Sequence, residues 1–217
     1  MISNFKLTIV IILLLNASSF YAQKSKLYKG NYNIEDIGQG EAEFDYQVKR
    51  KDTVFTGLFT FSKYIDKGDK QIIDYKGNFK QDQLNEKWEF SYKKIDSVGK
   101  QKADGFNILS QTSGKEFQLL AKFKDNQQAD EWSLIKRNYI NSQPKEAFYQ
   151  STITFDDKHI KRSFNASNSQ FDVEAGFNSS GLLEGELIIK HKDKKVKLKE
   201  VRIYNEGALE KHYFEID

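Results

Sequence analysis

The residues best suited to chemistry in this chain are three histidines and many carboxylates, and the chain has no cysteine. His159, His191 and His212 are far apart in the sequence, and no pair has the short spacing of a zinc motif. Without cysteine there is no thiol nucleophile and no disulfide framework. We therefore interpret the histidines as structural side chains, and we expect neither a metal nor a cofactor.

Carboxylates alternate along two segments and would share a strand face there. Glu41, Glu43 and Asp45 form one such set, and Glu184 with Glu186 forms another. Two carboxylates across a groove are the machinery of a glycoside hydrolase. However, alternating charges more often keep the solvent face of a sheet soluble. The chain has no Gly-x-Ser-x-Gly elbow and no phosphate-binding glycine loop. We expect that the protein is not an enzyme, and a carboxylate-dependent glycan hydrolase is the less favoured alternative.

Aromatic side chains are the second candidate group, with 17 Phe, 11 Tyr and 2 Trp. An exposed aromatic row can stack on sugars or grip a peptide, whereas rings that alternate with charged residues are typical of a core. The core interpretation is the favoured one. The candidate binding residues are Tyr75, Trp88, Tyr92 and Trp132.

The elements that carry these rings have the alternation of β-strands. Residues 72–80 alternate between polar and apolar side chains, which indicates a half-buried strand. Turn-tolerant residues at 81–83 interrupt the pattern, which then resumes through residue 92. The segment predicts a hairpin with one aromatic face and one charged face. Gly77 stands among the aromatic residues, where a missing side chain leaves room for a neighbouring ring.

Weaker copies of this hairpin recur along the chain. Copies begin near residues 28, 73, 117 and 171, a spacing of roughly 45–55 residues that indicates a repeat architecture. The step from Gly77 to Trp88 is eleven residues, and the step from Ala121 to Trp132 is the same. We therefore expect the hairpins to be related units.

One of these units resembles a known repeat. The pattern Tyr75-x-Gly77-x-Phe79, followed by Leu84 and Trp88, is similar to a MORN repeat in its bacterial YwqK-type variant. Residues 204–209 are similar to the end of such a unit. Asp82 and Glu86 stand where the family usually has glycine. The resemblance implies hairpins stacked side by side in an elongated antiparallel sheet, and it implies no specific activity.

The whole chain is predicted to be all-β. We expect roughly 12–14 strands in an antiparallel meander that forms one large curved sheet. Such a sheet can curl toward a barrel, fold over as a sandwich, or partly wrap its own aromatic face, and the last is favoured. Residues 96–104 are predicted as a polar loop. Val196 and Leu198 differ in parity from Val201 and Ile203, which predicts a β-bulge near residues 199–200.

The N-terminus has the features of an export signal. A segment with one cation, Lys6, precedes an apolar run at 7–15 and a small residue, Ala22. The apolar run is shorter than the 20 or so residues of a membrane span, although an uncleaved anchor is an alternative. We therefore expect a signal peptide at residues 1–22 and a single all-β repeat domain at residues 23–217. The location would be the periplasm, the outer surface or the extracellular space.

The small net charge of the chain bears on which classes of partner it could bind. The formal net charge is +3 and both signs are evenly mixed, so we expect no nucleic acid partner and no membrane contact beyond export. We expect an exported, non-catalytic repeat protein that binds a protein or cell-envelope component through its sheet surface. The alternative is a curled β-barrel that binds a lipid or another apolar ligand. The sequence leaves the oligomeric state open.

Overall fold

The computed structural model describes residues 24–67, 69–96, 100–105, 107–141, 143–193, 195–196 and 198–216. The expected signal peptide lies outside these residues. Strands joined by turns and short loops make up the described part of the chain, in which no helix could cross a membrane. The all-β prediction is confirmed.

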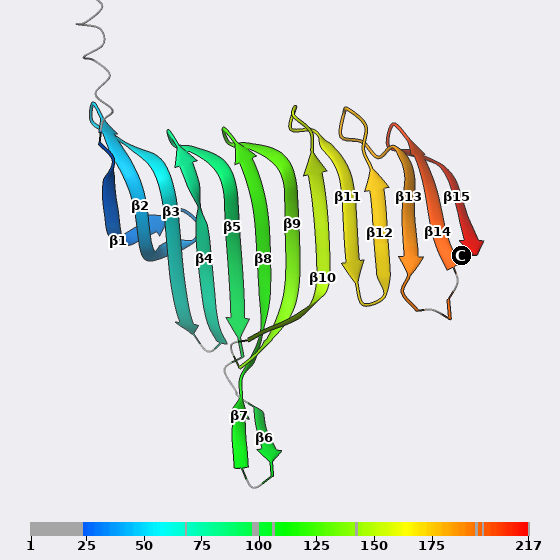
Figure 1. The fold of residues 1–217 in the computed structure, drawn as a ribbon, viewed down its shortest axis with the longest axis horizontal. Coiled ribbons are helices and arrows are strands. Elements are labelled where there is room, and N and C mark those ends of the chain that lie inside the picture. Colours follow the sequence, from blue (N-terminus) through cyan, green and yellow to red (C-terminus); the bar gives the residue numbers. More distant parts are fainter. Residues whose placement is uncertain are drawn as a thin grey trace, which may run out of the picture.

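Thirteen strands form one antiparallel sheet whose spatial order follows the chain, as Figure 1 shows. A separate hairpin, β6–β7, projects from the connection between β5 and β8 (Figure 1), in a segment partly predicted as loop. The sheet is open: β1 and β15 form its two edges. The predicted meander is therefore confirmed, and its curl stops short of a barrel. The strands are β1 Lys26–Ile34, β2 Gly38–Lys49, β3 Asp52–Lys67, β4 Asp69–Lys80, β5 Gln83–Ile95, β6 Lys100–Asp104, β7 Asn107–Gln111, β8 Ser113–Lys124, β9 Gln127–Ile140, β10 Gln143–Phe155, β11 Lys161–Asn168, β12 Phe171–Gly176, β13 Gly185–His191, β14 Leu198–Asn205 and β15 Ala208–Ile216.

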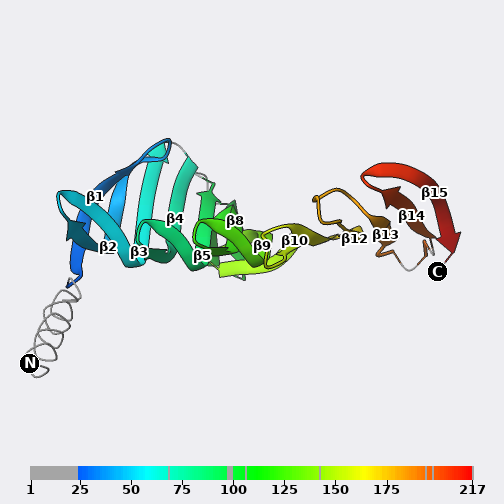
Figure 2. The ribbon, with the colours of Figure 1, turned by 90° about the horizontal axis from the view of Figure 1, so that it is seen from above.

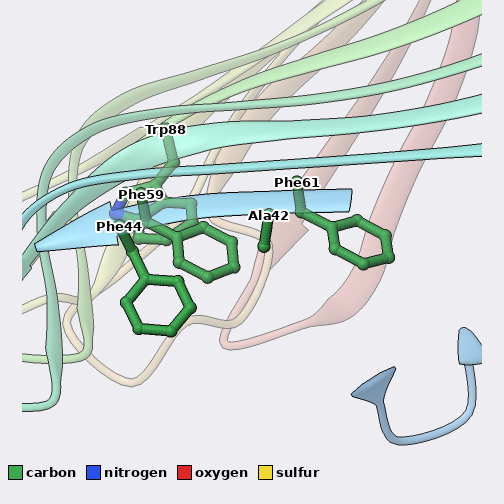
Figure 3. Close-up of a cluster of buried hydrophobic side chains, with 5 residues drawn as sticks. All are labelled: Ala42, Phe44, Phe59, Phe61 and Trp88. Carbon is green, nitrogen blue, oxygen red and sulfur yellow. The ribbon is translucent and has the colours of Figure 1, made fainter. Parts of the chain in front are cut away.

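The core lies on one face of the N-terminal half of the sheet. Five buried side chains form its centre (Figure 3): Ala42, Phe44, Phe59, Phe61 and Trp88. Phe44 stacks on Phe59 with ring centroids 5.9 Å apart, and Trp88 stacks on Phe90 at 5.7 Å. Figure 2 shows β1–β5 spread around this region, while β10–β12 form a thinner stretch. The aromatic face is therefore covered largely by its own rings, as the sequence predicts.

The hairpin of β4 and β5 and the hairpin of β8 and β9 are the same structure, 44 residues apart. The Trp88 indole N–H donates to the Asn78 carbonyl at 3.0 Å, and the Trp132 indole N–H donates to the Lys122 carbonyl at 2.9 Å. In both hairpins the strand register shifts at a small residue, which is Gly77 in the first and Ala121 in the second. The carbonyl that accepts the indole hydrogen bond belongs to the next residue. The equal spacing in the sequence therefore corresponds to an equal geometry.

The turns of these two hairpins also match. Gln81 and Asp82 have φ values of 52° and 64°, and Asp125 and Asn126 have values of 51° and 68°. Left-handed conformations at both central residues match the twist of a two-residue hairpin turn. Glu86, with φ of 60°, repeats the conformation in the following bulge. Asp82 and Glu86 thus occupy conformations that glycine adopts most easily.

Near the C-terminus apolar side chains also occupy the charged face of the sheet. Cα pairing links Glu174, on the charged face, to Ile188, Val201 and Tyr213 in one row across β12–β15. Val201 is only 1% exposed. The bulge predicted near residues 199–200 is wrong, because pairing with β15 is regular there and shifts only after Ile203. Leu198 and Val201 both lie in the regularly paired part of β14, on opposite faces, and Val196 lies in the loop before it.

Candidate binding face

Two adjoining grooves lie on the charged face of the sheet, opposite the aromatic core. The β1–β4 groove has a volume of about 650 Å³ and the β3–β9 groove about 620 Å³. Lys76 lines both grooves. Each volume lies within the usual range for ligand sites, which is about 300–1,000 Å³.

Strand register positions the groove residues in one row. Lys76 pairs with Thr60 on one side and with Glu89 on the other. Directly opposed residues share a face of the sheet, so their side chains point to the same side. The row crosses seven strands, a distance of about 30 Å at the usual strand spacing. Its members are Lys29, Glu43, Thr60, Lys76, Glu89, Leu120 and Ser133.

The β1–β4 groove is rich in carboxylates. Glu41, Glu43 and Asp74 line it together with Lys29 and Lys76. The Lys29 ammonium lies 3.1 Å from the Glu43 carboxylate. A hydroxyl fixes Asp74, since Ser62 Oγ donates to its Oδ1 at 2.7 Å. This end of the face therefore offers acceptors, fixed in position, to a ligand with hydrogen-bond donors or cations.

The β3–β9 groove combines aliphatic side chains with both signs of charge. Leu58 and Leu120 are exposed although they lie on the charged face. Lys122 forms an ion pair with Asp130 inside the groove. The remaining charged lining residues are Lys76, Lys87, Glu89 and Glu131. An extended ligand would meet apolar and ionic contacts at adjacent positions here.

A polar network beside the groove fixes Glu89. Gln118 Nε2 donates to Glu89 Oε1 at 2.6 Å, and Arg137 Nη2 donates to Gln118 Oε1 at 2.8 Å. Arg137 Nε lies 3.2 Å from the carboxylate of Glu116, which is 5% exposed. Hydrogen bonds and an ion pair thus connect Glu89 through Gln118 and Arg137 to the buried Glu116. These contacts pre-organise the groove wall at Glu89.

Lys93 completes the network around Glu116. Its ammonium lies 3.6 Å from the Glu116 carboxylate and 5.6 Å from the centre of the Tyr139 ring. Burial lowers the pKa of Lys93, but Tyr139 and the carboxylates of Glu116 and Asp74 outweigh burial and hold the pKa above its ordinary value. The buried carboxylate therefore has a cationic partner on each side.

The four aromatic residues singled out from the sequence lie on the aromatic face and pack against other rings. Trp88 is 4% exposed and packs over Gly77, while Tyr75 contacts Phe61 and Phe90. Tyr92 lies 6.1 Å from Phe117, and Trp132 lies 5.0 Å from Phe123, between ring centroids. Tyr75 and Tyr92 line a hollow of about 240 Å³, and Trp132 lies beside Phe155.

The histidines contact three different parts of the sheet. The ring of His159 bonds through Nδ1 to the Gln128 carbonyl at 2.5 Å, and the ring of His191 packs against Phe171. The Nε2 of His212 lies 3.0 Å from Glu200. Across the described ranges, no three His, Asp or Glu side chains are grouped so that they could hold a metal ion.

The carboxylates of the hydrolase hypothesis lie in separate places. Glu41 lines the β1–β4 groove, whereas Glu184 lies in the connection before β13, where it accepts a hydrogen bond from the Glu206 amide at 2.8 Å. The groove residues that sequence reasoning missed are Leu58, Lys76 and Leu120. One sequence feature identifies Leu58 and Leu120: each is an aliphatic residue at a strand position where the alternation predicts a polar side chain.

No protein-family model, curated protein or solved structure matches this chain. The similarity to MORN repeats therefore stays a prediction from sequence.

Proposed function

We propose that this chain is an exported, non-catalytic repeat protein that binds a protein partner through the two grooves of its charged face. One observation carries the proposal: the grooves adjoin at Lys76 along a single row of opposed residues. A row of about 30 Å matches an extended polypeptide better than a compact small molecule. Export rests on the N-terminal sequence pattern.

The lining chemistry favours polypeptide over glycan. Sugars are commonly bound by stacking on exposed aromatic rings, but the aromatic clusters of this sheet lie on the face opposite the grooves. The grooves offer carboxylates, ammonium groups, hydroxyls and the two exposed leucines Leu58 and Leu120. These are the groups that recognise alternating polar and apolar side chains of a peptide.

A lipid or another apolar ligand is the second candidate. The hollow at Tyr75 and Tyr92 favours it, because Ile73, Phe90 and Phe117 also line that hollow. Its volume of about 240 Å³ is below the usual range for small-molecule sites. The charged-face grooves are larger, so the protein-binding proposal takes precedence.

The proposal is tested by affinity capture from the cell-envelope fraction of the host. We expect Lys76→Glu to lower recovery of one or more proteins at least tenfold, since it reverses the charge shared by both grooves. The control is Lys145→Glu in β10, which reverses an exposed lysine outside both grooves and should leave recovery unchanged. Equal recovery with both variants would contradict the proposal, and recovery of lipid alone would favour the second candidate.

A further inference from the structure

The two edge strands of the sheet differ in how they are protected. Exposed edges offer free backbone groups to other strands, and lysines commonly discourage such pairing. β1 contains Lys26 and Lys29 and has no carboxylate. β15 instead contains both signs of charge, in Glu210, Lys211 and Glu215. Self-pairing of β1 would therefore leave its lysines without a carboxylate to match them, whereas β15 can match opposite charges.

Apolar exposure is also concentrated at β15. Leu209, Phe214 and Ile216 are 53%, 57% and 84% exposed. Phe214 and Ile216 lie on the same side of the strand, and the His212 ring packs 5.2 Å from the Phe214 ring. A second strand laid against this edge would cover these side chains.

The directions of β1 and β15 decide which edge strand of a second copy could pair with β15 in the antiparallel way. A meander of thirteen strands has an odd number, so β1 and β15 run the same way, as Figure 1 shows. Head-to-tail stacking of two copies would therefore join β15 to β1 in a parallel pair. A two-fold axis would instead join β15 to β15 in an antiparallel pair, which continues the pattern of the sheet.

Charge selects the register. With the axis at Tyr213, Lys211 faces Glu215 of the second copy twice, and His212 faces Phe214 twice. With the axis at Lys211, two lysines face each other. With the axis at His212, Lys211 faces Tyr213 instead. Only the register centred on Tyr213 pairs Lys211 with a carboxylate among these three.

We propose that two copies of this chain form a symmetric dimer through antiparallel pairing of their β15 strands, centred on Tyr213. The axis is perpendicular to the sheet, so the charged faces of both copies point to the same side. Phe214 of each copy is then covered by His212 of the other.

Sedimentation of the full mature chain tests the dimer. We expect a concentration-dependent dimer for the wild type, a monomer for Lys211→Glu, and recovery of the dimer in the Lys211→Glu/Glu215→Lys double variant. Lys26→Glu on β1, at an exposed lysine outside both grooves, is the matched edge control and should remain dimeric. A monomeric wild type, or a Lys211→Glu variant that dimerises as the wild type does, would overturn the proposal.

Cysteine cross-linking tests the register independently, because the chain has no cysteine of its own. Tyr213→Cys places two thiols on the axis and should give a covalent dimer under mild oxidation. Lys211→Cys alone should not, whereas the Lys211→Cys/Glu215→Cys double variant should. Cross-linking by Leu27→Cys on β1 in place of Tyr213→Cys would overturn the assignment to β15. Circular dichroism confirms that each variant is folded.

Discussion

Gly77 allows the Trp88 indole to lie against the strand beside it. A Cβ atom at Gly77 would lie 2.1 Å from Cδ2 of Trp88, far inside van der Waals contact. The same indole donates its N–H to Asn78, so it cannot turn away without losing that hydrogen bond. At the equivalent position, Ala121 keeps its methyl group, and Trp132 is less buried than Trp88. One missing methyl group thus distinguishes the two hairpins.

Gly77→Ala should lower the free energy of unfolding by about 1–3 kcal/mol, the usual cost of overpacking a core. Urea denaturation followed by tryptophan fluorescence measures the change. Lys76→Ala, at the neighbouring residue on the other face, is the control and should cost less than about 0.5 kcal/mol. A loss at Gly77 no greater than that of the control would contradict the packing described here.

At the scale of elements, the turns of the β4–β5 and β8–β9 hairpins each bind the hairpin before them. The Asp82 amide donates to the Phe55 carbonyl at 3.0 Å, and the Phe55 amide donates to Asp82 Oδ1 at 2.6 Å. Asn126 and Leu84 repeat both hydrogen bonds one unit later, at the same distances. One of the two hydrogen bonds at each turn is accepted by the side chain of Asp82 or Asn126. Glycine has no side chain and could not accept it.

Asp82→Ala should lower the free energy of unfolding by about 1–2 kcal/mol, since it removes a hydrogen bond and leaves alanine at a positive φ. Asp82→Gly also removes the hydrogen bond but tolerates the backbone conformation, so its loss should be smaller. Thermal unfolding of both variants separates the two effects. A larger loss for glycine than for alanine would show that backbone conformation does not matter at this turn.

The connection between β10 and β11 is held by the Asp156 carboxylate. The hydrogen bond from the Ile160 amide, with those from Arg162 and Lys158, holds the pKa of Asp156 below its ordinary value. Such a carboxylate stabilises the connection above its unfolded pKa, and the contribution is lost as pH falls through the lower folded pKa. The Ile160 amide resonance should therefore titrate with a midpoint below the ordinary pKa of an aspartate.

An NMR titration of the Ile160 amide checks the direction of this pKa shift. Asp156→Asn removes the titrating group, so the acid transition of that resonance should disappear. A midpoint at or above the ordinary aspartate value would contradict the hydrogen bonding described for this connection.

At the scale of the whole molecule, the sequence predicts the meander, the aromatic face and the relation between the two tryptophan hairpins. These features depend on alternation and spacing, which are local properties of the chain. The grooves depend on register across strands, which two-residue turns and bulges at Glu86 and Asp130 set. Leu198 and Val201 lie on opposite faces of one strand, and the parity of residues in the sequence does not distinguish that arrangement from a bulge.

Use of the charged face is the central claim, and the most direct measurement is site-specific photo-cross-linking in the host envelope. A benzophenone amino acid replaces Leu120 in the β3–β9 groove, and the control carries it at Phe148, which is exposed but outside both grooves. The account predicts a discrete protein adduct from position 120 that Lys76→Glu abolishes, and no such adduct from position 148. Equal adducts at both positions, or none at position 120, would contradict it.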